Sequence, residues 1–177
     1  MSLIDTISPE QADGAVAAIY RGVQERFGFV PNGLQLLAPS PKLLEDQVGR
    51  IAYYHSHPTL GGALLAAIRY LVADHTGCTY CIDLNAGMLL QMGYTPEVLQ
   101  AARRDPDALP LPARDKAMLH LALKVVRAAH EVRESDIAEL RALGWRDQEI
   151  LEAAHHATFA VSLDLVFNAF QVDAEAL

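Results

Sequence analysis

Apolar residues recur every three to four positions along most of this chain, which is the spacing of one face of an α-helix. Leu64, Ile68, Leu71 and Val72 show the pattern clearly. No segment of useful length alternates apolar and polar residues, as a half-buried strand would. The sequence therefore predicts an all-α fold.

Turn and capping residues divide this pattern into successive helices. Ser8 followed by Pro9 is typical of a helix start, and Gly77 and Gly93 are typical of helix ends. The Pro-rich segment 105–112 is interpreted as a connection, so residues 1–177 are predicted to form a single domain. The predicted helices cover residues 8–27, 34–37, 41–56, 60–75, 78–93, 95–104, 112–130, 136–143 (capped by Ser135) and 146–171.

The last of these helices is apolar on nearly every side from Ala153 to Phe170. A helix of this kind lies either at the centre of a core or in a contact between subunits. Arg69 and Asp164 interrupt otherwise apolar helices, and they are candidates for an internal ion pair, for an interface contact or for a solvated face.

Charge and composition narrow the classes of partner. The chain has 14 basic and 22 acidic residues, a net charge of −8, and no cluster of Lys or Arg. This balance argues against binding to nucleic acid or to an anionic membrane surface. The longest apolar run, residues 60–68, is shorter than a membrane span, and no signal-peptide pattern opens the sequence. We therefore expect a cytoplasmic protein without a membrane segment.

Candidate chemistry centres on Cys78 and Cys81, the only cysteines of the chain. They follow Gly77 at the predicted start of a helix, where unpaired N–H groups and the helix dipole favour a thiolate. Their i, i+3 spacing allows a disulfide. In a reducing cytosol such a pair is more often redox-active or metal-binding than structural.

Two other interpretations of the pair stay open. Zinc would need further ligands, for which His75, His155 and His156 are available. The pair could also be inert and retained for packing. A disulfide-forming pair is favoured, so the sequence predicts no metal and no cofactor.

Three segments together resemble a known family. Residues 26–45 read RFGFVPNGLQLLAPSPKLLE, residues 60–66 open an apolar helix, and residues 77–81 read GCTYC at the start of the next apolar helix. This combination resembles the carboxymuconolactone decarboxylase/AhpD-like family, and more closely its peroxidase-related alkylhydroperoxidase members. The resemblance implies an all-helical AhpD-like fold with a helical hairpin around Cys-x-x-C, assembled into homo-dimers, trimers or hexamers.

The resemblance also implies an activity. Members with the cysteine pair reduce organic hydroperoxides and are regenerated by an external dithiol electron donor. Carried over, Cys81 attacks the peroxide and becomes a sulfenic acid, and Cys78 resolves it to a disulfide. Decarboxylase members lack the pair, so its presence favours redox chemistry.

The chain departs from the family pattern at the proton relay. The Glu and His of the relay are replaced by Ala66 and Asn85. Asn85 shares a helix face with Cys81 and can form a hydrogen bond, but an amide takes no proton near neutral pH. His75, three residues before Cys78, is the first hypothesis for a replacement base. A second group of candidates could approach through tertiary packing: His55, His57, His155 and His156.

The missing relay keeps a second function open. The chain is predicted to be a thiol-dependent peroxidase that these replacements weaken. The alternative is a non-catalytic or redox-sensing member of the same fold that binds a small molecule.

Overall fold

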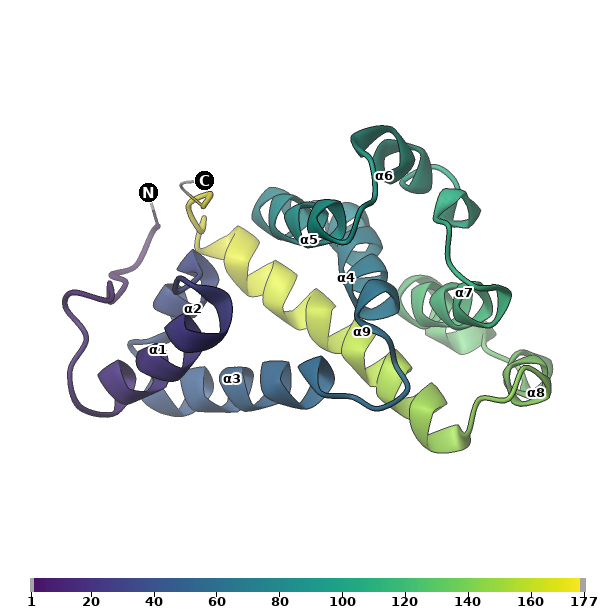
Figure 1. Ribbon diagram of the computed structural model, residues 1–177, viewed down its shortest axis with the longest axis horizontal. Helices are drawn as coiled ribbons and strands as arrows, with labels where there is room; N and C mark the ends of the chain where they lie inside the picture. The colour runs from purple at the N-terminus through teal and green to yellow at the C-terminus, as the bar shows by residue number, and fades with distance from the viewer. Residues whose placement is uncertain (1, 176–177) are drawn as a thin grey trace. The chain divides into compact units, whose positions relative to one another are not determined.

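The computed structural model describes residues 2–175, and these residues form α-helices, two short 3-10 helices and no strand (Figure 1). The predicted all-α class is confirmed. The helices are α1 (Gly14–Phe27), α2 (Asn32–Leu37), α3 (Pro41–His55), α4 (Gly62–Thr76), α5 (Thr79–Gln91), α6 (Pro96–Ala102), η1 (Pro106–Ala108), α7 (Ala113–Ala128), η2 (Ala129–Glu131), α8 (Glu134–Ala142) and α9 (Asp147–Ala169).

The chain forms two compact units, with the boundary inside α9. The first comprises residues 1–57 and 166–177, and the second comprises residues 58–165. In the first unit, Val16 and Val23 of α1 pack with Leu34 of α2 and Leu44 of α3. The candidate site lies wholly in the second unit. The assignment of the whole chain to one domain stays a prediction.

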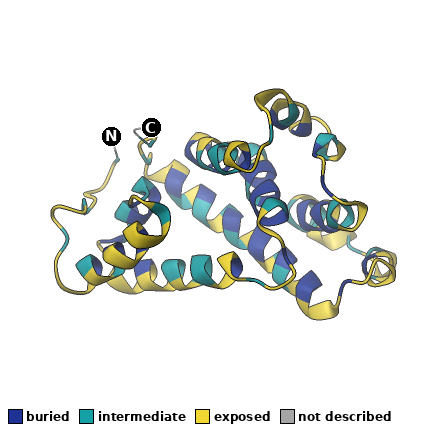
Figure 2. Cartoon of the chain, viewed as in Figure 1, coloured by how far each residue is buried: buried dark blue, intermediate teal, exposed yellow. Residues whose placement is uncertain are grey.

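Helix α4 is the central element of the second unit. Its buried residues lie on nearly every side, from Leu64 to Ala73, because the helix carries few polar side chains. It packs against α5 and α7 (Figure 2). Ala66 and Ala67 are fully buried, and their small side chains allow a close approach of neighbouring elements. Helices α4 and α5 form the predicted hairpin around Gly77.

Helix α9 is less uniformly buried than its composition predicts. Ala153, Ala157 and Ala160 are buried at helical spacing, whereas Leu151 and Leu165 are 70% and 57% exposed. In the described part of the chain, α9 is the one helix long and apolar enough to cross a membrane, a test that core helices of soluble proteins also pass. The expected absence of a membrane segment stays a prediction.

Two helix starts differ from the predictions. Helix α1 begins at Gly14, because the Ser8 hydroxyl donates to the Glu10 carboxylate (2.7 Å) and residues 8–11 form only a turn. Helix α8 begins at Glu134, with Arg133 as its N-cap residue in place of Ser135. The Arg133 N–H donates to the Asp136 carboxylate at 2.8 Å, which satisfies a backbone donor at this helix end.

The turn that delivers the chain to the cysteines requires a left-handed residue, and this gives a stability prediction. Gly77 has φ 72°, and a Cβ there would meet no atom within 4 Å. Gly77→Ala should therefore lower the free energy of unfolding by about 1–2 kcal/mol through backbone strain alone. Gly87→Ala is the matched control, because Gly87 lies inside α5 with equally open space. That change should raise stability by about 0.5–1 kcal/mol. Urea unfolding of both variants measures the difference, and equal effects would contradict the role of Gly77.

Candidate functional site

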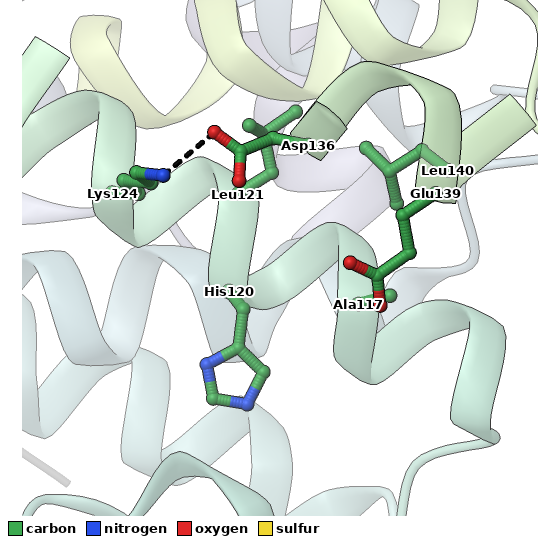
Figure 3. Close-up of a pocket in the computed structure, with 7 residues that line it drawn as sticks. All are labelled: Ala117, His120, Leu121, Lys124, Asp136, Glu139 and Leu140. Atoms are coloured by element: carbon green, nitrogen blue, oxygen red, sulfur yellow. Dashed lines mark hydrogen bonds and ion pairs between the residues drawn. The ribbon is translucent and has the colours of Figure 1, made fainter. Parts of the chain in front are cut away.

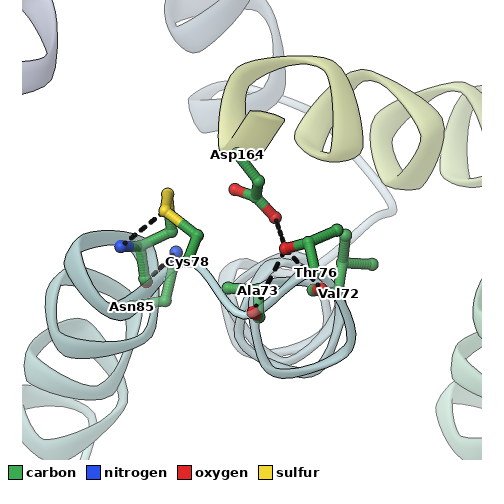
Figure 4. The surroundings of a disulfide bond; sticks show 7 residues. Val72, Ala73, Thr76, Cys78, Asn85 and Asp164 are labelled. Atoms are coloured by element: carbon green, nitrogen blue, oxygen red, sulfur yellow. Dashed lines mark hydrogen bonds between the residues drawn. A yellow bond between two sulfur atoms is a disulfide. The ribbon is translucent and has the colours of Figure 1, made fainter. Parts of the chain in front are cut away.

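The two cysteines are held at the N-terminus of α5 and are joined by a disulfide (Figure 4). Their Cα atoms are 5.2 Å apart. Cys78 is the N-cap residue, and its Sγ accepts a hydrogen bond from the Cys81 N–H at 3.3 Å. Both residues are buried, with 1% and 5% of their surfaces exposed. The predicted disulfide spacing is therefore realised at a buried helix start.

The helix terminus acts mainly on Cys78. A backbone N–H that donates to a sulfur atom stabilises negative charge there, and the helix dipole adds to this effect. In the disulfide-bonded protein, Cys78 is thus the cysteine whose sulfur accepts from a backbone donor. The resemblance assigns the attack on peroxide to Cys81 and the resolving role to Cys78, and both roles stay predictions.

Asn85 supports the backbone of Cys81. Its Nδ2 donates to the Cys81 carbonyl oxygen at 2.8 Å, and its Oδ1 accepts from Arg69 Nε at 2.7 Å. An arginine can only donate, so the amide orientation is fixed by this contact. Both ends of the Asn85 side chain are engaged, and the residue is buried. Asn85 lies one turn after Cys81, as predicted, but it donates to the Cys81 backbone carbonyl.

Arg69 also reaches His156. Its Nη1 lies 3.1 Å from His156 Nε2, and the same nitrogen lies 3.3 Å from the Leu65 carbonyl oxygen. Because the guanidinium has no acceptor, Nε2 accepts in the shorter contact with Arg69, and it cannot donate to Leu65 at the same time. Burial lowers the pKa of Arg69 to about 10. Burial first, and then the charge of Arg69, lower the pKa of His156 to about 3. His156 is therefore neutral near pH 7, and it forms one connected polar group with the half-buried Arg69 and the buried Asn85.

Asp164 of α9 extends its carboxylate toward Thr76 and the disulfide (Figure 4). One of its carboxylate oxygens lies within 4.8 Å of both sulfur atoms. The Thr76 hydroxyl donates to the carboxylate at 2.8 Å. Burial raises the pKa of Asp164 to about 6, against the lowering effect of the Thr76 bond.

The position of Asp164 was not predicted. The residue is 4% exposed, so a solvated face is wrong. Arg69 donates to Asn85 and His156, so the ion pair suggested from the sequence is replaced by two separate sets of contacts. The available signal was an acidic residue inside an apolar helix, but the sequence does not show which helix faces it.

His75 lies in the last turn of α4 with an exposed side chain, whereas the sulfur atoms are buried. Among the described residues, the group of His, Cys, Asp and Glu side chains gathered within 4.8 Å of one another contains Cys78, Cys81 and Asp164 but no histidine. The roles of His75 and of the other histidines as bases thus stay predictions.

The same group bears on metal binding. Three atoms could contact an ion, one fewer than a closed tetrahedral zinc site uses. In the disulfide the two sulfur atoms are bonded to each other, so a metal would require the reduced pair. The geometry suits a dithiol/disulfide couple, and the predicted absence of a metal and a cofactor stays a prediction.

A separate cavity of about 280 Å³ lies between α7 and α8 (Figure 3). Its lining includes His120 and Glu139, and an ion pair of 2.6 Å joins Lys124 to Asp136 at its edge. None of its lining residues belongs to the cysteine site. The cavity therefore adds nothing to the chemistry of the pair.

Comparison with known proteins agrees with this fold. No family model matches the chain. An AhpD-core, peroxidase-related protein from Ralstonia eutropha JMP134 is 25% identical, with a TM-score of 0.79 over 98% of this chain and 95% of that one. A peroxidase-related protein from Silicibacter sp. TM1040 is 24% identical, with a TM-score of 0.82 over 98% of this chain and 88% of that one. The debrominase Bmp8 is 19% identical, with a TM-score of 0.79 over 99% and 94% of the two chains.

One curated relative also matches. An alkyl hydroperoxide reductase of Mycobacterium tuberculosis, Rv2159c, is 28% identical over 92 residues, which are 52% of this chain. The match spans only 27% of that longer protein. The chain therefore has an AhpD-like fold with a close cysteine pair. Within this class, the chain is similar to the peroxidase-related members, which confirms the resemblance seen in the sequence.

The buried, neutral His156 predicts a pH dependence of stability. Its pKa in the folded protein, about 3, is below the ordinary 6.5, so the unfolded chain binds the proton more readily. Its contribution is complete above pH 6.5 and is lost as the pH falls toward 3. Between pH 7 and 5, His156 should lower the free energy of unfolding of the wild-type protein by on the order of 1–2 kcal/mol. His156→Gln should remove this loss. Urea unfolding of the oxidised protein at several pH values measures this.

Two acidic residues also make the stability depend on pH, and they do so equally in the wild-type protein and in His156→Gln. Asp164, with its raised pKa, adds stability as the pH falls below about 6, and Glu149, with a pKa of about 2, loses stability only below its ordinary 4.5. His155→Gln, at an exposed position on the same helix, is the control and should keep the wild-type slope. An unchanged slope in His156→Gln would contradict a neutral His156.

Proposed function

We propose that this protein is a thiol-dependent peroxidase that reduces organic hydroperoxides through a Cys78–Cys81 dithiol/disulfide cycle. The observation that carries the proposal is the disulfide-bonded pair at the start of α5 in an AhpD-like fold. Peroxidase-related names among the structural neighbours and the reductase name of the curated relative support it.

The cycle begins with attack on the peroxide by Cys81 and ends with reduction of the disulfide. The Cys81 thiol loses a proton, and its sulfur attacks one peroxide oxygen while the O–O bond breaks. Cys81 becomes a sulfenic acid, and the alkoxide takes up a proton to leave as an alcohol. The Cys78 sulfur then attacks the Cys81 sulfur, forms the disulfide and releases water. An external dithiol reduces the disulfide and is itself oxidised.

The helix start supports the second step. The Cys81 N–H donates to Cys78 Sγ, so a thiolate on Cys78 is stabilised where it must attack. The first step lacks the family relay, because Ala66 has no polar group and both ends of Asn85 are engaged. A positioned acid or base typically contributes 10²–10⁴-fold. Unless another group replaces the relay, the peroxidase should be slow.

The proposal also covers the compartment, the oligomeric state and the partners of the protein. We place the protein in the cytoplasm, as a homo-oligomer without metal, cofactor, nucleic-acid partner or membrane segment. The exposed Leu151 and Leu165 on α9 support assembly, because large apolar side chains at the surface favour contacts between copies.

A non-catalytic, redox-sensing protein of the same fold is the second candidate. It is favoured by the same replacements at Ala66 and Asn85 and by the burial of both sulfur atoms. A sensor of this kind would hold thiols that react slowly with peroxide. The two candidates therefore differ in how fast the thiols of Cys78 and Cys81 react with peroxide.

A thiol count separates these candidates. Fully reduced protein, mixed with about one equivalent of an organic hydroperoxide, should lose two thiols per chain because the chain has no other cysteine. Cys78→Ser should lose its single thiol and accumulate a sulfenic acid at Cys81, trapped with a dimedone-type reagent and located by mass spectrometry. Cys81→Ser should react much more slowly.

One result would contradict the peroxidase, and a second would change the roles of its two cysteines. Wild-type protein that keeps both thiols for an hour would favour the redox-inert or slow-sensing protein. A fast reaction in Cys81→Ser, with Cys78 carrying the sulfenic acid, would exchange the roles of the two cysteines but keep the cycle.

A further inference from the structure

We propose that Asp164 is the proton-transfer group of the cysteine pair, taking the place of the missing relay. Its carboxylate accepts the proton of the attacking thiol and returns it to the alkoxide oxygen that leaves the peroxide. This inference rests on the proposed peroxidase function and names the group that completes its first step.

The inference starts from the position of the carboxylate. An Asp164 oxygen lies within 4.8 Å of both sulfur atoms, and all three residues are buried. A separation this short leaves no space for a water molecule directly between carboxylate and sulfur. Figure 4 shows the Asp164 side chain extending from α9 toward the disulfide and Thr76. Reduction frees each Cys side chain to rotate about its Cα–Cβ bond, which allows a thiol to reach the carboxylate.

Thr76 holds this carboxylate in place. Its hydroxyl donates to Asp164 Oδ2 at 2.8 Å, and it also lies 3.1 Å from the Val72 carbonyl oxygen and 3.2 Å from that of Ala73. Thr76 is the last residue of α4, two positions before Cys78. The carboxylate is therefore anchored to the same turn that carries the cysteines, so it moves with them.

The other polar groups near the pair are less suited to this step. Asn85 has no titratable proton, and its amide is committed to Arg69 and the Cys81 carbonyl. His156 has a pKa of about 3, too low for a base near pH 7, and it accepts from Arg69. His75 has an exposed side chain, whereas both sulfur atoms are buried.

The acidity of Asp164 suits both halves of the transfer. Burial raises its pKa to about 6 from an ordinary 3.8. At pH 7 the group is therefore mostly ionised and can accept a proton. A pKa near the working pH also makes the protonated form a competent donor a moment later, which is the condition for efficient acid–base catalysis.

The proton balance requires both directions of transfer. The thiol gives its proton to the Asp164 carboxylate, and the sulfur attacks one peroxide oxygen. As the O–O bond breaks, the carboxylic acid returns the proton to the departing alkoxide, which becomes an alcohol. Asp164 ends ionised, Cys81 is oxidised to sulfenic acid, and the hydroperoxide is reduced.

Two reactions of the same thiol test this role. Alkylation by iodoacetamide needs only a thiolate, because the iodide that leaves takes no proton. Reduction of a hydroperoxide needs a thiolate and a proton for the leaving alkoxide. In Cys78→Ser protein, we expect Asp164→Asn to slow the hydroperoxide reaction about 10²-fold or more at pH 7. Iodoacetamide alkylation of Cys81 should not slow, because removing a nearby negative charge favours the thiolate.

Asp83→Asn is the matched control. It removes a carboxylate two residues from Cys81, but Asp83 is exposed on α5, and both rates should stay within about twofold of the parent. Asp164→Asn should fold, because the amide oxygen can still accept from Thr76 and a buried charge is removed. Near-UV circular dichroism of each variant checks this.

The outcomes separate this inference from the proposed function. If the parent protein consumes hydroperoxide and Asp164→Asn consumes it equally fast, Asp164 is not the proton-transfer group although the peroxidase stands. A parallel fall in both reactions would mean that Asp164 only shapes the site, which also overturns the inference. A parent that alkylates normally but ignores hydroperoxide would overturn the proposed function itself.

Discussion

Burial of polar groups inside apolar helices is the constraint on which the second unit depends. Arg69 is half-buried, and three further polar residues, Asn85, His156 and Asp164, are buried, where an unsatisfied polar group costs about 1–3 kcal/mol. Their contacts divide them into two sets, one containing Arg69, Asn85 and His156 and the other joining Asp164 to Thr76. Both sets end at the turn that carries the cysteines, so chemistry and packing share the same residues.

The first set shows what the replacement of a relay histidine by Asn85 achieves. An amide has a donor and an acceptor at opposite sides of one group, and here these connect the Arg69 guanidinium to the Cys81 carbonyl. A titrating imidazole would exchange these roles as its charge changed. At the position where the resemblance places the relay histidine, Asn85 instead supports the backbone of α5, so the proposed peroxidase needs proton transfer from another element.

The sequence predicted those features that depend on local patterns. Helical periodicity identified the all-α fold, and the Gly77–Cys78 start and the Cys-x-x-C spacing located the pair, because these signals lie within a few residues of each other. Asp164 was missed because it lies 83 residues after Cys81, and its approach depends on how α9 packs. The predicted starts of α1 and α8 were wrong because of two carboxylates: that of Glu10 accepts from the Ser8 hydroxyl, and that of Asp136 accepts from the Arg133 N–H.

The charge of the buried site explains why a carboxylate fits this thiol chemistry. A buried thiolate beside a neutral amide adds a full negative charge to an apolar region, which is costly. A thiol beside the Asp164 carboxylate already holds one negative charge, and moving the proton to the carboxylate only moves that charge to sulfur. When the alkoxide leaves and takes the proton back, the charge returns to the carboxylate. The site carries one negative charge throughout this attack on the peroxide, so this step does not require the burial of a second.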